Sequence, residues 1–332
     1  MASPLIFQQA KSLLIEMGAS RRLGELVKGL GSKRTLLVTD PGVRGAGLLE
    51  ESVESLLVAG VHVTMFDKTV ADPPDSLVLE CAAFARDEGV DSVVGFGGGS
   101  SMDVAKLVAL LASPTSSQPL GEMFGVGNAR GERLPLVQVP TTAGTGSEVT
   151  PISIITTGAA EKKGVVSPLL LPDLAVLDGD LTLSLPAPVS AASGIDAMVH
   201  AIEAYTSRLH KNPLSDVYAR EALRLLSANI VTVCDEFQQP SGALRRTLPL
   251  PLTLTTDPNP KTNLNLTLTL TLTRCAEACT RSHAAGLVLR RDGLRQRTGR
   301  RGARPRLPAR RTLQGEPHGL SNLSSPDAPR CT

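Results

Sequence analysis

Short apolar runs alternate with segments of helical periodicity through the first half of the chain. Because strands that alternate with helices form parallel sheets covered on both faces, this order predicts an α/β domain. The runs that predict strands are 35–40, 61–66, 90–96 and 134–139. The segments with apolar residues at helical spacing are 48–58, 76–88 and 102–112.

From about residue 185 the pattern becomes helical, with predicted helices at 188–205 and 214–230. We therefore expect a nucleotide-binding α/β domain at 1–184 and the start of an all-α domain at 185–237. Residues 238–332 differ from both in composition and are expected to be low-complexity or mistranslated sequence.

A glycine-rich loop, Gly97–Ser101, follows the strand predicted at 90–96. Glycine lets backbone N–H groups approach a ligand, and the helix expected from Met102 would direct its positive end at that ligand. A pyrophosphate would suit this loop, but tight packing explains it equally well, because the Gly-x-Gly-x-x-Gly fingerprint is absent.

A second loop of similar character follows the strand predicted at 134–139. Its hydroxyl groups come from Thr141, Thr142, Thr145 and Ser147. Two such loops at one sheet edge favour a nucleotide crevice. Asp40, at the end of another strand, is either an acceptor for ribose hydroxyls or a turn residue before Pro41.

Asp196 and His200 are four residues apart in a predicted helix, so their side chains share one face. A carboxylate oxygen with an imidazole nitrogen suits iron, zinc or manganese rather than calcium or magnesium. The alternative is an Asp in a first helical turn beside an ordinary core His. On spacing alone, that alternative is the more common case.

Four motifs together resemble the iron-dependent, group III alcohol dehydrogenases, over residues 5 to 236. They are GFGGGSSMDVAK (95–106), PTTAGTGSE (140–148), PDLAVLD (172–178) and GIDAMVHAIEAY (194–205). The resemblance implies a Rossmann-like domain that binds NAD(P) and a helical domain that holds one divalent metal ion. It places the active site in the cleft between the two domains.

The resemblance also implies roles for individual residues. Asp196 and His200 match metal ligands for Fe²⁺ or Zn²⁺. Asp40 matches a position where a carboxylate favours NAD over NADP by repelling a 2′-phosphate, and Asp103 lies at the start of the helix after the first loop. The other positions that match cofactor-binding residues are Gly98, Gly99, Ser100, Ser101, Thr141, Thr142, Thr145 and Lys162.

The resemblance stops near Phe237. Residues 247–273 read TLPLPLTLTTDPNPKTNLNLTLTLTLT, which different frames of a CCCTAA-like repeat would encode. A retained intron explains this run better than a folded strand. Codons for residues 282–315 can be chosen that, when read one base out of frame, encode the helix that the family has here and this chain lacks. The family's third His ligand would then fall across the codons of Ala303 and Arg304.

The frame is then regained at Pro317–Asn322, where His318 matches the family's fourth metal ligand. The alternative for His318 is a solvent-exposed residue of a tail. Arg304 cannot replace a neutral imidazole, because its guanidinium has no free lone pair. We therefore expect a damaged metal site and a destabilised, inactive product, from a pseudo-enzyme or a faulty gene model.

The charge distribution and the cysteines indicate no further function. Residues 281–311 hold eleven Arg against one Asp, but they contain no aromatic residue for base stacking, and the frame shift explains their composition. Cys275, Cys279 and His283 lack the spacing of a zinc site. Five scattered Cys and no long apolar run favour a cytoplasmic protein.

The function expected from the resemblance is reversible hydride transfer between NAD(H) and a small alcohol or aldehyde on a divalent metal. Maleylacetate reductase, glycerol dehydrogenase and dehydroquinate synthase are related alternatives. We expect neither nucleic acid nor a membrane as a partner, and a homodimer is possible.

Overall fold

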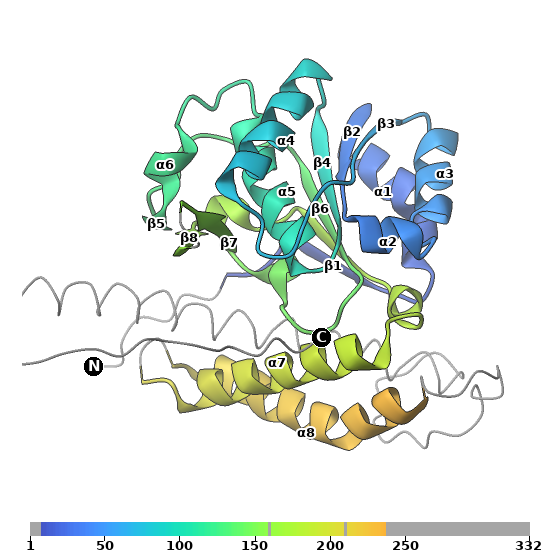
Figure 1. The fold of residues 1–332 in the computed structure, drawn as a ribbon, viewed down its shortest axis with the longest axis vertical. Helices are drawn as coiled ribbons and strands as arrows, with labels where there is room; N and C mark the ends of the chain where they lie inside the picture. Colours follow the sequence, from blue (N-terminus) through green and yellow to red (C-terminus); the bar gives the residue numbers. More distant parts are fainter. Residues whose placement is uncertain (1–7, 159–160, 209–210, 237–332) are drawn as a thin grey trace, which may run out of the picture. The chain divides into compact units, whose positions relative to one another are not determined.

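The computed structural model describes residues 8–236 except 159–160 and 209–210, and its centre is a six-stranded parallel sheet (Figure 1). The strands follow the order β1-β9-β6-β4-β2-β3, and each neighbouring pair is parallel. Their bounds are β1 Ser12–Ile15, β2 Arg34–Val38, β3 His62–Phe66, β4 Ser92–Gly97, β6 Leu136–Pro140 and β9 Leu174–Leu177.

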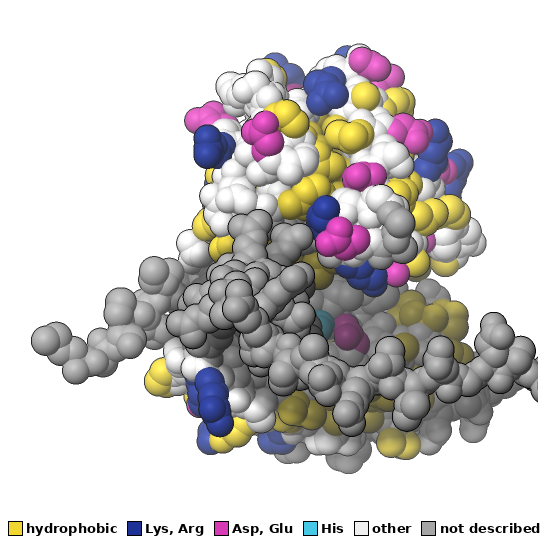
Figure 2. Space-filling view, turned by 60° about the vertical axis from the view of Figure 1, so that its left-hand side comes forward, with side chains coloured by type: hydrophobic (Ala, Val, Ile, Leu, Met, Phe, Trp, Pro, Cys, Tyr) yellow, Lys and Arg dark blue, Asp and Glu magenta, His cyan; other side chains and the backbone are white. Residues whose placement is uncertain are grey.

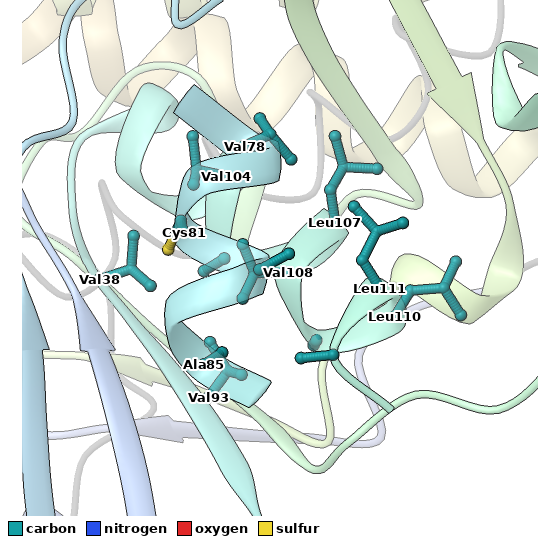
Figure 3. Close-up of a cluster of buried hydrophobic side chains, with 14 of the residues drawn as sticks. Val38, Val78, Cys81, Ala85, Val93, Val104, Leu107, Val108, Leu110 and Leu111 are labelled. Atoms are coloured by element: carbon teal, nitrogen blue, oxygen red, sulfur yellow. The ribbon is translucent and has the colours of Figure 1, made fainter. Parts of the chain in front are cut away.

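Helices cover both faces of this sheet because its inner strands are apolar on both sides. On β2, Leu36 and Val38 face one cluster while Leu37 faces the other. Helices α4 (Asp75–Asp87) and α5 (Gly99–Leu111) pack on the first face, as Figure 3 shows. Helices α1 (Leu23–Gly29) and α3 (Glu50–Val58) pack on the second face.

A smaller sheet lies beside α5 and carries one of the predicted cofactor residues. It has the order β5-β8-β7, with β5 Gly125–Val126, β7 Ile152–Thr157 and β8 Glu161–Val166. Strands β7 and β8 form an antiparallel hairpin. The remaining short helices are η1 Ala19–Arg22, α2 Pro41–Gly45, α6 Leu120–Met123, η2 Ser147–Val149, η3 Pro168–Leu170 and η4 Gly179–Thr182.

Two long helices, α7 (Ala187–Thr206) and α8 (Pro213–Glu236), end the described part of the chain. They pack through small residues, with Ala197 and Ala201 of α7 against Ala219 and Ala222 of α8. Other apolar side chains of this pair lie at its surface, as Figure 2 shows in yellow. The large exposed ones are Val189, Ile195, Val199, Ile202, Tyr205, Leu214, Val217 and Val231. No described helix is long and apolar enough to cross a membrane.

The structure confirms the predicted α/β class and has a strand or helix at each predicted position, although the helix predicted at 214–230 extends to Glu236. Two predictions were wrong in detail. Residues 40–42 do not form a simple turn, because Asp40 caps α2 and Pro41 occupies its first position, both helix-start signals. The helix after the glycine loop begins at Gly99 rather than Met102. Strands β1 and β9 and the small sheet had not been predicted. Residues 238–332 lie outside the described residues.

Candidate cofactor and metal site

The strand order reverses between β2 and β4, and the predicted cofactor residues gather at that point. Strand β3 lies beyond β2 on one side, while β6 and β9 lie beyond β4 on the other. In open α/β sheets, ligands bind in the crevice at the carboxyl ends of the strands where the order reverses. Asp40 follows β2 and Gly98 follows β4, so both lie at this crevice.

A cavity of about 410 Å³ opens at this position. It is lined by Asp40, Pro41, Thr69, Val70, Ala71, Gly98, Gly99, Ser100 and Ser101. Five of these residues, namely Asp40 and Gly98–Ser101, had been singled out from the sequence. The segment Thr69–Ala71 had not, because it follows β3 without a glycine-rich or hydroxyl-rich motif.

The N-terminus of α5 is suited to an anion. Its N-cap is Gly98, which offers no side-chain hydrogen bond, and its first turn has no acidic residue. The first N–H groups of the helix therefore face the cavity without an internal partner. Gly97 has φ +150°, and a Cβ there would lie 2.9 Å from Ser101 Oγ, so glycine is required at this position.

Asp40 has a structural role while it lines the cavity. Its Oδ1 accepts a hydrogen bond from Val43 N (3.0 Å), which caps α2. Its Oδ2 accepts a hydrogen bond from Ser101 Oγ (3.2 Å). Asp40 is thus a helix cap rather than a simple turn residue, and capping fixes its carboxylate at the cavity wall.

The second glycine loop lies against the first. Thr141 is buried, and its N–H donates to Gly97 O (3.0 Å). A Cβ on Gly99 would lie 2.9 Å from Thr145 Cγ2, and one on Gly98 would lie 3.8 Å from Thr142 Cγ2. The structure thus brings the three predicted threonines beside the first loop.

Lys162 lies on the small sheet and pairs with the residue that follows the cavity wall. It is exposed on β8, and its Nζ lies 2.7 Å from Asp72 Oδ1. Asp72 adopts φ +51° directly after Ala71 of the cavity wall. The predicted contact between Lys162 and a cofactor stays a prediction.

Asp196 and His200 lie on α7, and the second loop touches this helix. A Cβ on Gly144 would lie 2.8 Å from Ser193 O, less than one turn before Asp196. Asp196 is the tenth residue of α7, so the interpretation as a first-turn Asp was wrong. His200 Nε2 lies 3.7 Å from Asp196 Oδ1, too far for a hydrogen bond.

The metal-binding interpretation rests on this pair alone within the described residues. His200 Nδ1 is buried there without a hydrogen-bond partner. No group of three or more His, Cys, Asp or Glu side chains that could hold a metal is found among those residues. His318 lies outside them, as do Cys275, Cys279 and His283.

A buried charged cluster beside the second loop had not been predicted from the sequence. Lys106 is fully buried and Glu148 is 2% exposed. Burial raises the pKa of Glu148 to about 7, although its own backbone N–H and the Lys106 ammonium act in the opposite direction. Burial lowers the pKa of Lys106, against the opposing charges of Asp103 and Glu148. The spacing of Asp103 and Lys106 in one helix was the available sequence signal.

Two sequence families match consecutive parts of the chain. The model described as "Iron-containing alcohol dehydrogenase" matches residues 10–179. The model described as "Fe-containing alcohol dehydrogenase family, C-terminal" matches residues 190–245.

Individual relatives agree with these matches. Long-chain-alcohol dehydrogenase 1 of Geobacillus thermodenitrificans is 41% identical over 214 residues, which are 64% of this chain and 54% of that protein. The NAD-dependent methanol dehydrogenase of Bacillus methanolicus is 36% identical over 215 residues, 64% of this chain and 56% of that protein. The chain thus spans little more than half the length of these relatives.

Solved structures show the same fold. A 1,3-propanediol oxidoreductase structure is 29% identical, with a TM-score of 0.70, and the match covers 83% of this chain and 66% of that one. An iron-containing alcohol dehydrogenase of Thermotoga maritima is 28% identical, with a TM-score of 0.69, covering 84% of this chain and 70% of that one.

Proposed function

Because this chain belongs to the iron-containing alcohol dehydrogenase family, we propose that its crevice binds NAD(H) for the interconversion of a small alcohol and its aldehyde. The observation that carries the proposal is the uncapped N-terminus of α5 at the point where the strand order reverses. Long-chain-alcohol, methanol and sulfoacetaldehyde enzymes all occur among its relatives, so these relatives narrow the substrate no further than alcohols and carbonyl compounds.

The residues of the crevice fit a dinucleotide. The N–H groups of Gly99, Ser100 and Ser101 would bind the pyrophosphate at the positive end of α5. The Asp40 carboxylate would accept hydrogen bonds from ribose hydroxyls and repel a 2′-phosphate, which favours NAD over NADP. That one relative is an NAD-dependent methanol dehydrogenase supports this preference.

The donor pair on α7 fits part of a site for iron or zinc. Asp196 and His200 are not hydrogen-bonded to each other, so an oxygen and a nitrogen donor remain available on one helical face. A bound divalent metal would supply Lewis acidity that lowers the pKa of an alcohol hydroxyl. His318 is a further proposed ligand.

A second candidate function is that of a pseudo-enzyme that binds NAD(H) without transferring hydride. The sequence around residue 304 favours it. An Arg stands fourteen residues before His318, where the resemblance requires a neutral His. A guanidinium cannot coordinate a cation, so the metal site would lack a ligand even when the cofactor is bound.

A titration of the full chain with NADH, followed by the fluorescence of the cofactor, tests the proposed function. We expect saturable binding that Gly99→Val weakens about tenfold, equivalent to about 1.4 kcal/mol, since a Cβ at Gly99 already meets Thr145. Gly121→Val is the matched control, because a Cβ on Gly121 meets nothing within 4 Å. A folded wild-type chain that does not bind NADH would contradict the proposal.

Catalysis is tested separately by adding Fe²⁺ or Zn²⁺ and a series of alcohols to the NAD-bound chain. Hydride transfer would support the dehydrogenase. NADH binding without turnover would support the pseudo-enzyme.

A further inference from the structure

We propose that Lys106 is a positioning residue for the cofactor, because its buried ammonium holds the second glycine loop against α5. The inference rests on the proposed binding of NAD(H) and adds to it a residue that does not touch the crevice. Lys106 lies on α5, and its side chain is fully buried.

The ammonium group of Lys106 has a partner for each of its three hydrogens. Nζ donates to Ser147 Oγ at 2.7 Å, to Thr150 Oγ1 at 3.2 Å and to Ile152 O at 2.6 Å. A neutral amine would have only two hydrogens for these three acceptors. The three acceptors match the three hydrogens of the ammonium form, and Asp103 Oδ1, at 3.5 Å, supplies the opposite charge.

Ser147 transmits the position of this ammonium to the loop. Its hydroxyl accepts from Lys106 and donates to Asp103 Oδ1 (2.5 Å), so charged groups fix it from both sides. Its backbone N–H donates to Thr145 Oγ1 (3.3 Å). The Thr145 side chain is the group that a Cβ on Gly99 would meet. These contacts lead from the middle of α5, through the loop, back to the first residue of α5.

Stability alone does not account for the buried pair of Lys106 and Asp103. A buried ion pair is commonly no more stabilising than apolar residues of similar volume, because both charges lose their hydration. Here the partners of Lys106 lie at the end of the second loop and the start of β7. The second carboxylate oxygen of Asp103 also contacts β7, since Oδ2 accepts from Ile154 N (2.8 Å). The charges thus fix one relative position of the loop, the helix and the small sheet.

Ser147→Ala tests the inference without removing a charge. We expect it to raise the dissociation constant for NADH about tenfold or more, because it removes two hydrogen bonds to charged groups. Ser147→Thr keeps a hydroxyl group and should retain most of the affinity. Ser153→Ala is the matched control, because Ser153 is also buried and donates to Asp103 O (2.9 Å), but lies on β7 outside the loop.

Lys106→Met, which removes the ammonium, should bind NADH more weakly than Ser147→Ala, and thermal unfolding of each variant reports its folding. If wild type binds NADH and Ser147→Ala binds equally well, the inference is wrong while the proposed function stands. Equal losses in Ser147→Ala and Ser153→Ala would show a general structural role and also overturn it. If wild type does not bind NADH, both proposals fail.

Discussion

At the scale of single residues, Glu148 beside the second loop has a pKa well above that of a carboxyl in water. Its side chain is buried, and its Oε2 has no hydrogen-bond partner. Burial raises the pKa of this carboxyl from 4.5 to about 7. The folded protein therefore retains a proton on Glu148 over a pH range in which the unfolded chain releases it.

The raised pKa predicts how stability depends on pH. The contribution of Glu148 is fully present below pH 4.5 and is lost as the pH rises through about 7. Glu148→Gln removes this titration, so we expect its free energy of unfolding relative to wild type to increase between pH 5 and pH 8, by at most about 3 kcal/mol. Urea denaturation at several pH values measures the difference.

The control for this experiment is Glu54→Gln, which changes an exposed carboxyl on α3. Its difference from wild type should not vary with pH in the same way. Parallel pH profiles for wild type and Glu148→Gln would contradict the prediction.

At the scale of elements, the contact between the second glycine loop and α7 depends on Gly144, which has no side chain. A Cβ on Gly144 would lie 2.8 Å from the backbone oxygen of Ser193 and 2.9 Å from its Cβ. Backbone atoms cannot move aside as the end of a long side chain can. The loop and the helix that carries Asp196 can therefore approach this closely only with glycine at 144.

Gly144→Ala should accordingly destabilise the protein by about 1–3 kcal/mol, the usual cost of overpacking. Gly29→Ala is the control, because Gly29 ends α1 with nothing within 4 Å of its Cβ position. Alanine is the better helix former, so that change should be neutral or slightly stabilising. Thermal unfolding of both variants checks the pair, and equal midpoints would contradict the role given to Gly144.

The elements that the sequence predicted are those with a local signal. Strand β4 is a buried apolar run and ends in glycines, so its position and the loop after it could be inferred. Strand β8 begins Glu161-Lys162-Lys163 and has a single buried residue, Val165, so its sequence shows no alternation of apolar and polar positions. Strand β1 has only four residues and pairs with β9, about 160 residues later, and such pairing leaves no local pattern.

The same limit applies to the candidate site. Glycine and threonine loops carry a motif, and so does an Asp and His pair at helical spacing. The link from Lys106 through Ser147 to Thr145 depends instead on how α5, the loop and β7 pack, so its partners could not be chosen from the sequence.

At the scale of the whole molecule, the described residues include the cavity at the predicted cofactor residues and two of the predicted metal ligands. The chain spans little more than half of its relatives' length. Helix α7 carries Asp196 and His200, and α7 and α8 together leave several large apolar side chains exposed. The resemblance assigns two further ligands to a region where Arg304 and His318 stand.

We therefore predict that the chain binds the cofactor but does not hold a metal ion tightly. We expect the purified 332-residue chain to bind NADH but to retain much less than one equivalent of iron or zinc after dialysis, measured by elemental analysis. Two or three protein ligands, with an Arg where the resemblance requires a His, provide too few donors for tight binding. Replacing residues 237–332 with the segment that follows the matched region in the Geobacillus relative should restore about one metal per chain.

His200→Ala in that chimera should lose the metal again, which would show that the restored site includes the α7 pair. Stoichiometric metal in the unmodified chain, lost on His200→Ala and on His318→Ala, would contradict the prediction. It would mean that His318 completes a working site despite Arg304. NADH binding by the same samples distinguishes a missing ligand from a misfolded protein, since the cofactor crevice is built from residues before α7.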